Sequence, residues 1–401
     1  MIAAERESPP LVARAAQARS PFVRLTELLT GTQPGKPVIN LSVGEPQHAV
    51  PDFVGPVIAK HIPELGRYPM TRGTDRFRQA VAGWLGRRFA LPRALDPDHE
   101  VLVLAGTREG LFLAALTAGR LFEKRNGAIL IPNPFYAVYA AGATAAGCEP
   151  VYLPATRQSG FLPDLDALDE SLLRRTVAFY LASPANPQGS VADAAYLSRL
   201  VGLARRYGLI IFADECYSEI YSDKKPAGVL EAAGPDFANV AIFHSLSKRS
   251  SLPGLRIGFT AGDRNFIAPY LELRNIAAPQ VPIAAQEVAV AAYGDESHVE
   301  ENRRLYAAKF DLADQIIGDR YGYKRPAGGF FLWLDVSRHG GSETATLKLW
   351  REAGVRVVPG RYLAHEQQDG SNPGEGYIRV ALVQDKATTA EALHRLVAVL
   401  G

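Results

Sequence analysis

Cysteine is scarce in this chain, and the residues present do not form a recognisable pair. Cys148 and Cys216 are the only cysteines among 401 residues, and neither belongs to a CxxC spacing. We therefore expect neither a disulfide scaffold nor a thiolate zinc site.

A surplus of charge of one sign is also missing. The 44 lysines and arginines nearly balance 42 aspartates and glutamates, which leaves a formal net charge of +2. This balance provides no electrostatic reason to expect nucleic acid or an anionic membrane as a partner. With 47% hydrophobic and 21% charged residues, the composition is typical of a globular protein, and the length predicts two domains.

Long apolar segments are few, and none is typical of a signal or a membrane span. Residues 1–20 mix both charge signs and lack the apolar centre of a secretory signal. The uncharged run 126–148 is long enough to span a membrane, but it contains Pro132, Asn133 and Pro134 near its start. A strand, a turn and a helix fit this run better, so we expect a cytoplasmic protein.

The middle of the chain alternates short apolar runs with segments of helical periodicity. Continuous Val, Ile, Leu and Phe runs are typical of strands buried on both faces. Their alternation with helices, for example at 107–122 and 194–207, predicts a mostly parallel sheet covered by helices on both sides. The predicted strands lie at 99–106, 127–134, 148–155, 176–184, 207–215, 239–247 and 255–262.

The pattern changes after about residue 281. A long charged helix is predicted at 295–317, and strands at 328–336 and 376–383 suit a small α+β domain. The first 40 or so residues hold several prolines and one short helix, so they cannot form a domain alone and are expected to pack as an arm. The predicted division is an N-terminal arm with part of the small domain at 1–45, a large domain at 46–285 and a small C-terminal domain at 286–401.

Four predicted strands end in polar residues, and in open α/β sheets ligands collect at the carboxyl ends of strands. The first of these strands ends at Gly106, and Thr107 opens the next helix, where free backbone N–H groups suit a phosphate and Thr107 can cap the helix. An ordinary helix cap is the alternative interpretation. No GxGxxG motif occurs here or elsewhere, which excludes an NAD-dependent oxidoreductase.

The next two strand ends carry an amide and a carboxylate. Asn186 lies in a turn between Ala185 and Pro187, where its side chain can simply form an Asx-turn. Asp214 ends a buried strand and is followed by Tyr217. Burying a carboxylate is costly unless an arginine, a metal or a protonated ring nitrogen pairs with it. No histidine lies nearby in sequence at ligand spacing, so we expect no metal.

The fourth strand end is the stretch FHSLSKRSSLPGLRIGF at 243–259, which contains Lys248. A solvated loop explains its hydroxyls and its lysine. A lysine at the end of a strand in a polar pocket is also the arrangement needed for a Schiff base, because desolvation and a neighbouring cation lower the pKa of an amine. Ser245, Ser247 and Arg256 would then supply phosphate ligands, and Arg256 can grip two oxygens.

Together these features resemble the fold-type I pyridoxal 5′-phosphate (PLP) enzymes, specifically the class I/II aminotransferases. The resemblance spans almost the whole chain. It implies PLP as the cofactor and an α/β architecture, the PLP-dependent transferase fold type I, with a large domain built on a mostly parallel seven-stranded sheet between helices and a smaller α+β domain. The matching segments are GEP at 44–46, RYPMTRGTDRFRQAVAGW at 67–84, SPANPQG at 183–189, DECY at 214–217, SLSK at 245–248, GLRIGF at 254–259 and YIRVAL at 377–382.

The resemblance implies roles around the cofactor ring. Lys248 would form the Schiff base with PLP and, once released by substrate, move a proton between the substrate and the cofactor. Asp214 would pair with the protonated pyridine nitrogen and keep the ring an electron sink. Tyr217 and Asn186 would hydrogen-bond the phenolate oxygen of the cofactor, and Tyr136 would stack on the ring.

The resemblance also implies a phosphate site shared between subunits. Tyr68 would reach the cofactor phosphate of the other subunit, so the active sites of a homodimer would be shared across the interface. The phosphate of the chain's own cofactor would be held by the backbone of Gly106, Thr107 and Arg108 and by the side chains of Ser245, Ser247 and Arg256.

Substrate binding is implied for a third group. Arg379 would grip the α-carboxylate of the substrate through a bidentate pair, Gly44 would let the backbone approach that carboxylate, and Asn186 would contribute as well. A surface ion pair on an edge strand is the alternative for Arg379. Candidates by position for reading a distal carboxylate are Arg24, Arg72 and Arg108.

The reaction expected is transamination by a ping-pong mechanism. An amino acid donor, with glutamate expected as in much of the family, would pass its amino group to the cofactor and then to a 2-oxo acid. The segment SKRSSLPGLR at 247–256 most resembles the N-succinyldiaminopimelate aminotransferases of lysine biosynthesis, whereas Ile257 and the segment 275–289 depart from their pattern. An aspartate or aromatic aminotransferase and a carbon–sulfur β-lyase are the alternatives. A PLP-domain regulator is excluded because the N-terminal part leaves no room for a helix-turn-helix module.

Overall fold

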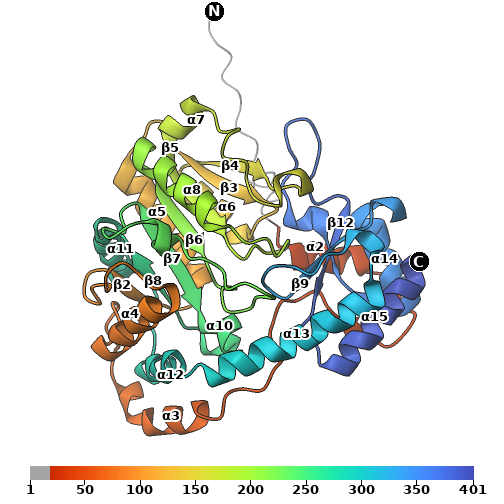
Figure 1. Ribbon diagram of the computed structural model, residues 1–401, viewed down its shortest axis with the longest axis horizontal. Coiled ribbons are helices and arrows are strands. Elements are labelled where there is room, and N and C mark those ends of the chain that lie inside the picture. The colour runs from red at the N-terminus through yellow and green to blue at the C-terminus, as the bar shows by residue number, and fades with distance from the viewer. Residues whose placement is uncertain (1–18) are drawn as a thin grey trace, which may run out of the picture.

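Seven strands form one sheet that runs through the larger part of the molecule (Figure 1). The structure is a computed structural model and describes residues 19–401. The order of the strands across the sheet is β2-β8-β7-β6-β5-β3-β4. All neighbours are parallel except β8, which is antiparallel to both β2 and β7. The mostly parallel seven-stranded sheet is therefore confirmed. The strands are β2 (Val101–Leu104), β3 (Ala128–Asn133), β4 (Glu149–Pro154), β5 (Thr176–Ala182), β6 (Ile210–Asp214), β7 (Val240–Ser245) and β8 (Gly258–Gly262).

Helices cover both faces of this sheet, which explains the continuous apolar runs. On strand β5, Phe179 and Leu181 face one core while Ala178 and Tyr180 face the other, and all four are buried. One core contains α5 (Thr107–Phe122), α6 (Ala137–Ala145) and α11 (Arg264–Ala277). The opposite core contains α3 (Val54–Lys60), α4 (Asp75–Phe89), α7 (Glu170–Arg175), α8 (Ala194–Tyr207), α9 (Val229–Ala232) and α12 (Ile283–Gly294).

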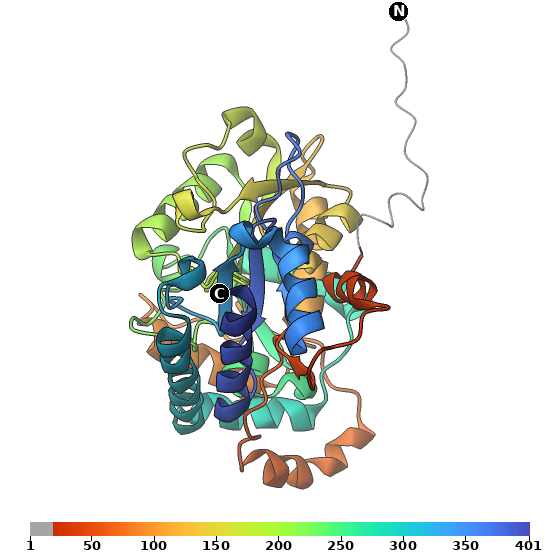
Figure 2. The same cartoon turned by 90° about the vertical axis from the view of Figure 1, so that its right-hand side faces the viewer.

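A second, smaller sheet lies beside the first and carries the C-terminal part of the chain (Figure 2). In this sheet, strand β12 lies between β11 and β9 and is antiparallel to both. Strands β1 and β10 form a separate two-stranded parallel sheet. The predicted strands at 328–336 and 376–383 correspond to β9 and β12. The elements of this part are α2 (Pro21–Leu29), β1 (Ile39–Asn40), α13 (Ser297–Ile317), β9 (Phe331–Asp335), α14 (Gly341–Ala353), β10 (Val355–Arg356), β11 (Val358–Pro359), β12 (Tyr377–Ala381) and α15 (Lys386–Leu400).

Helix α13 connects the two parts and runs from beside α12 towards α15 (Figure 1). Its buried Tyr306, Phe310 and Ile317 belong to the core of the small sheet, and Leu41 joins the same core from the N-terminal side. The predicted domain boundaries at 45/46 and 285/286 stay predictions, and the arm residues 1–18 lie outside the described part of the chain.

Local chemistry determines where several helices begin. Thr74, Asp193 and Asp385 each accept a backbone N–H from the first turn of α4, α8 and α15. A similar cap corrects one expectation: the strand predicted through Ser247 ends at Ser245, whose hydroxyl accepts the Ser247 N–H. Lys248 therefore lies on a one-turn helix, α10 (Leu246–Arg249), rather than at the end of a strand.

No helix within residues 19–401 combines the length and the apolar composition needed to cross a membrane. A cytoplasmic location stays a prediction.

Candidate active site

Most of the predicted site residues lie at the carboxyl edge of the large sheet. Asn186 follows β5, Asp214 ends β6 and Lys248 lies just after β7; these strands are adjacent and parallel. Thr107 begins α5 after β2, which runs in the same direction as β7 because both are antiparallel to β8. Arg379 enters from β12 in the small sheet.

The amine of Lys248 is partly buried and has one hydrogen-bond partner. Its Nζ donates to the carbonyl oxygen of Gly44, and it lies 5.9 Å from the ring centroid of Tyr217 and 5.5 Å from that of Phe330. Burial lowers the pKa of Lys248 to about 8, and the positive charge of Arg379 acts in the same direction. The amine is therefore far closer to its uncharged, nucleophilic form at neutral pH than an exposed lysine.

Asp214 is held by neutral donors alone. Its Oδ2 accepts the hydroxyl of Tyr139 at 2.8 Å and its Oδ1 accepts the Cys216 N–H at 3.3 Å. Within residues 19–401, no arginine, lysine or histidine forms an ion pair with this carboxylate. The Cys216 thiol in turn lies 3.2 Å from Thr107 Oγ1. Of the partners considered for Asp214, an arginine of residues 19–401 does not fill that role.

Two side-chain contacts near the end of β6 were missed by sequence reasoning. Tyr139 was assigned only to a helix, although its hydroxyl directly orients the carboxylate. His244 lies 29 residues from Glu215 in sequence, yet its Nε2 is 2.9 Å from Glu215 Oε2 in the buried interior. The register of β6 and β7, which aligns Asp214 with Phe243, brings this pair together. Local spacing contains no signal for either contact.

Backbone and basic groups form a cradle at the start of α5. Gly106 is the N-cap with φ +82°, and no side chain caps the helix, so the predicted capping by Thr107 is wrong. A Cβ atom at Gly106 would lie 2.5 Å from Nη2 of Arg256, so only glycine lets this guanidinium approach. Ser245 Oγ donates to Ser247 Oγ at 2.8 Å on the neighbouring α10. Open N–H groups, hydroxyls and an arginine suit an anion.

Arg379 is buried and forms no ion pair within residues 19–401, which contradicts the alternative of a surface pair on an edge strand. Its Nη1 donates to Asn186 Oδ1 at 3.0 Å and its Nη2 donates to the Ser42 carbonyl at 2.7 Å, while its Nε has no partner. The guanidinium carbon lies 4.4 Å from the ring centroid of Phe331. Burial lowers the pKa of Arg379 to about 10. An incoming carboxylate would satisfy this under-bonded cation.

Gly44 and Asn186 are both placed beside these cations. A Cβ atom at Gly44 would lie 2.6 Å from Cζ of Phe331, so no side chain fits there. The carboxamide of Asn186 bonds to Arg379 across the two sheets, and no backbone N–H within residues 19–401 donates to it in the Asx-turn considered as the alternative.

Tyr136 and Arg108 line the mouth of the site. Arg108 Nε donates to the Tyr136 hydroxyl at 2.6 Å, and the Tyr136 ring meets the Tyr139 ring edge-on at 5.7 Å. Burial raises the pKa of Tyr136. The other candidates for reading a distal carboxylate are less free: Arg24 stacks 3.8 Å above the Tyr362 ring, and Arg72 donates to the Asp98 carbonyl at 2.7 Å.

Tyr68 is the one predicted site residue that the fold of a single chain leaves outside. Its side chain is 95% exposed and follows a 3-10 turn at Ile62–Gly66. A role in the site of a second subunit stays a prediction.

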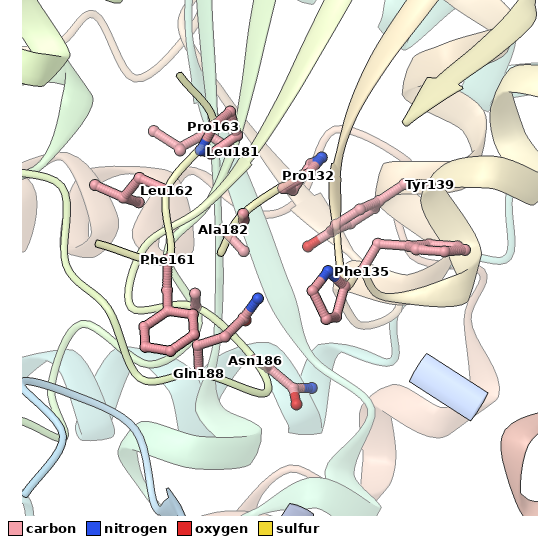
Figure 3. Close-up of a pocket in the computed structure, with 13 residues that line it drawn as sticks. Pro132, Phe135, Tyr139, Phe161, Leu162, Pro163, Leu181, Ala182, Asn186 and Gln188 are labelled. Carbon is pink, nitrogen blue, oxygen red and sulfur yellow. The ribbon is translucent and has the colours of Figure 1, made fainter. Parts of the chain in front are cut away.

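A small cavity lies next to the site, between the ends of β3 and β5 and the segment around Phe161 (Figure 3). It measures about 10 Å³. Tyr139, Asn186 and Gln188 contribute polar groups to a lining that is otherwise made of prolines and apolar side chains. This volume is about that of a single water, so the cavity does not accommodate a substrate.

Comparison with known proteins supports one family across nearly the whole chain. The sequence pattern described as aminotransferase class I and II matches residues 36–396. The LL-diaminopimelate aminotransferase of Syntrophobacter fumaroxidans is 33% identical over 91% of this chain and 92% of its own, and that of Moorella thermoacetica is 32% identical over 99% and 97%.

Solved structures agree with this result. A crystal structure of an aminotransferase from Neisseria meningitidis Z2491 matches with a TM-score of 0.90 at 38% identity, covering 96% of this chain and 98% of the other. The aminotransferase AspB from Helicobacter pylori 26695 matches with a TM-score of 0.87 at 33% identity, covering 95% and 98%. With the lysine and the uncompensated aspartate at the edge of the large sheet and the buried arginine on β12 of the small sheet, the chain belongs to the class I and II aminotransferases, which depend on PLP.

Proposed function

We propose that this chain transfers an amino group between glutamate and the 2-oxo acid counterpart of LL-diaminopimelate, in two half-reactions at one site. The observation that carries the proposal is the convergence of Lys248, Asp214 and Arg379 from three separate elements on one site. The first provides an amine, the second an anion without a cationic partner, and the third an under-bonded cation.

The residues present fit PLP. When bound, PLP supplies an aldehyde that accepts amino groups and an electron-poor ring that stabilises negative charge on the substrate α-carbon. The carboxylate of Asp214, oriented by Tyr139, matches a protonated ring nitrogen because no cation of residues 19–401 pairs with it. The cradle of Gly106 and Arg256, with the α5 N-terminus, matches a phosphate, and we assign Thr107, Arg108, Ser245 and Ser247 to it as well.

In this proposal Lys248 is the catalytic residue. Its lowered pKa leaves Nζ able to attack a carbonyl carbon near neutral pH and later to take up and return a proton. Tyr217 lies beside the amine and has a pKa raised well above its ordinary value by burial, so its hydroxyl stays a hydrogen-bond donor. Asn186 donates through its amide nitrogen, since its oxygen faces Arg379. Tyr136 covers the ring.

Arg379 orients the substrate. The bonds to Asn186 and Ser42 fix the plane of the guanidinium, and an α-carboxylate can approach its remaining N–H groups in a bidentate manner. Gly44, which has no room for a side chain, leaves the backbone open beside that position.

The substrate assignment follows the named relatives. LL-diaminopimelate aminotransferases share 30–33% identity with at least 90% of this chain. The structure titled probable N-succinyldiaminopimelate aminotransferase, from Thermus thermophilus, is 24% identical and therefore supports the fold alone. We accordingly favour the unmodified diaminopimelate over the N-succinyl derivative that the segment 247–256 suggested.

A titration tests the substrate assignment. PLP-loaded protein is mixed in turn with glutamate, LL-diaminopimelate and N-succinyl-LL-diaminopimelate, and the visible absorbance of the cofactor is followed. We expect half-transamination with glutamate and LL-diaminopimelate, at least about tenfold faster than with the succinyl compound, because a pocket shaped for one end group excludes a bulkier one. Faster reaction with the succinyl compound would reverse the assignment. Pyruvate and ammonia from cysteine-like substrates would indicate a β-lyase.

We also propose a homodimer. Exposed apolar side chains gather on the segments 43–70, and a second copy would cover them and receive Tyr68 in its own site. These side chains are Val43, Val50, Ile58, Ile62, Leu65, Tyr68 and Met70.

A further inference from the structure

A chain of polar side chains crosses between the two sheets behind the site and has no part in the chemistry proposed above. His48 lies between β1 and α3, Ser251 follows α10, and Asn302 and Lys309 lie on α13. Asn302 is 5% exposed and Lys309 is 3% exposed. Lys309 forms no ion pair with a carboxylate of residues 19–401, and burial lowers its pKa to about 8.

The direction of the hydrogen bonds follows from what each group can donate. Asn302 Nδ2 donates to the Arg249 carbonyl at 3.1 Å, so Asn302 Oδ1 must be an acceptor. His48 Nδ1 therefore donates to that oxygen, which leaves His48 Nε2 to accept from Lys309 Nζ at 2.8 Å. Burial lowers the pKa of His48, in agreement with a neutral ring. The bonds run one way, from Lys309 through His48 to Asn302.

One end of this network holds the helix of the catalytic lysine. Asn302 Nδ2 lies 3.5 Å from the Lys248 carbonyl as well as 3.1 Å from that of Arg249, and Ser251 Oγ donates to Asn302 Oδ1 at 3.1 Å. The backbone of α10 and the side chain of Ser251 are thereby attached to α13.

Lys309 and His48, at the other end of the network, are connected to the segments that contain Arg379 and Gly44. Lys309 Nζ donates at 3.2 Å to the carbonyl of Leu382, which lies just beyond Arg379 on the same strand end. His48 follows Gly44 on one short segment, and the Gly44 carbonyl accepts the Lys248 amine. One network thus links the backbones that carry the amine, its acceptor and the carboxylate-binding arginine.

We propose that His48, Asn302 and Lys309 are positioning residues that keep Lys248 and Arg379 in fixed relation across the two parts of the molecule. The inference rests on the roles proposed above for those two residues. A buried amine without a charged partner is costly, and removing it offsets the cost of leaving the Leu382 carbonyl and the His48 ring without a donor, so an apolar side chain of equal length at position 309 should change the stability of the fold little. The substitution removes the link between the two segments, because the carbonyl of Leu382 and the ring of His48 lose their common donor.

The test uses PLP-loaded Lys309→Met and His48→Asn. We expect Lys309→Met to unfold close to the temperature of the wild type, with kcat/KM for LL-diaminopimelate reduced about tenfold. His48→Asn keeps a donor near the Nδ1 position but loses the acceptor for Lys309, and its kcat/KM for LL-diaminopimelate should fall by a similar factor. The pH midpoint of the cofactor absorbance, which reports the environment of Lys248, should shift in both variants. A purely structural role would lower the unfolding temperature and leave that midpoint unchanged.

The matched control is Tyr306→Phe. Tyr306 lies between Asn302 and Lys309 on α13, and its ring centroid is 4.5 Å from that of His48. Its buried hydroxyl has no hydrogen-bond partner among residues 19–401, so its removal should change neither turnover nor the pH midpoint.

The outcomes separate cleanly. If both variants keep kcat/KM within about twofold of the wild type and the same pH midpoint, the proposal is overturned. If Lys309→Met does not fold, the half-buried His48→Asn decides by the same two readouts. Lys248→Ala serves as the reference: if it retains turnover, the proposed function fails, whereas an inactive Lys248→Ala beside wild-type behaviour in the network variants refutes the positioning role alone.

Discussion

At the scale of the residue, the site consists of polar groups whose surroundings make them reactive. Lys248 and Arg379 are two cations in one partly desolvated site, and each has its pKa lowered by burial. Asp214 is an anion whose hydrogen-bond donors are all neutral. Substitutions at these positions should therefore affect chemistry and binding separately.

Lys248→Ala should fold and bind PLP but lose turnover by a factor of about 10⁴ or more, because the nucleophile and proton carrier are the same amine. Steady-state kinetics with glutamate measure the turnover, and circular dichroism shows whether the variant folds. Substantial turnover in a well-folded variant would contradict the role of Lys248.

The lowered pKa of Lys248 predicts a pH dependence with a definite sign. In cofactor-free protein the amine loses its proton as the pH rises through about 8, so its reductive methylation should rise with pH around that midpoint. An exposed lysine changes only near about 10.4. Peptide mass spectrometry of the protein methylated at a series of pH values gives the extent of methylation of Lys248 and of the exposed lysines at each pH. A midpoint for Lys248 near that of the exposed lysines would show that burial does not perturb its amine.

Arg379→Lys keeps the charge but loses the planar fork. We expect KM for amino acid donors to rise about thirtyfold or more, with little change in PLP retention, because a bidentate pair is lost only when substrate binds. Substrate kinetics and equilibrium dialysis of the cofactor distinguish the two effects. Equal loss of both would indicate a structural role for Arg379.

At the scale of the element, the strands were predictable and the short helix was not. Continuous apolar runs indicate buried parallel strands because both faces of β5 and its neighbours meet a helical layer. The one-turn α10 escaped prediction because it depends on one hydroxyl, that of Ser245, accepting an N–H two residues later. The resemblance to a known family predicts Lys248 and Arg379 in one site, whereas the contacts of Tyr139 and His244 arise only from strand register and helix packing.

The segment that contains Gly44 provides a test at this scale. Gly44→Ala should lower the free energy of unfolding by about 1–3 kcal/mol and reduce turnover, because the new Cβ meets the Phe331 ring and displaces the carbonyl that accepts Lys248. Urea denaturation and kinetics are the measurements.

Gly86→Ala on α4 is the matched control for Gly44→Ala. A Cβ atom there meets nothing within 4 Å, so the change should raise helix stability by about 0.5–1 kcal/mol and leave turnover unchanged. If Gly44→Ala behaves like Gly86→Ala, the close approach of the Gly44 backbone to the Phe331 ring is not needed for activity.

At the scale of the whole molecule, the site is assembled from two sheets and, in our proposal, from two subunits. Tyr68→Ala and Lys248→Ala should each be poorly active as homodimers. If Tyr68 acts in the partner's site, mixing and refolding them should restore about a quarter of wild-type turnover, since about half the dimers are mixed and each mixed dimer has one complete site. No gain on mixing would place Tyr68 in its own chain's site or outside any site.

The sequence by itself determined the fold class and the family, because these depend on local periodicity and on motifs within short segments. Tertiary structure alone decided how the candidate site residues are held. The neutral donors to Asp214, the burial that lowers the pKa of Lys248 and the network through His48, Asn302 and Lys309 join positions up to 261 residues apart. Such contacts arise from strand register and from the packing of α13 across both sheets, and no local pattern of residues encodes them.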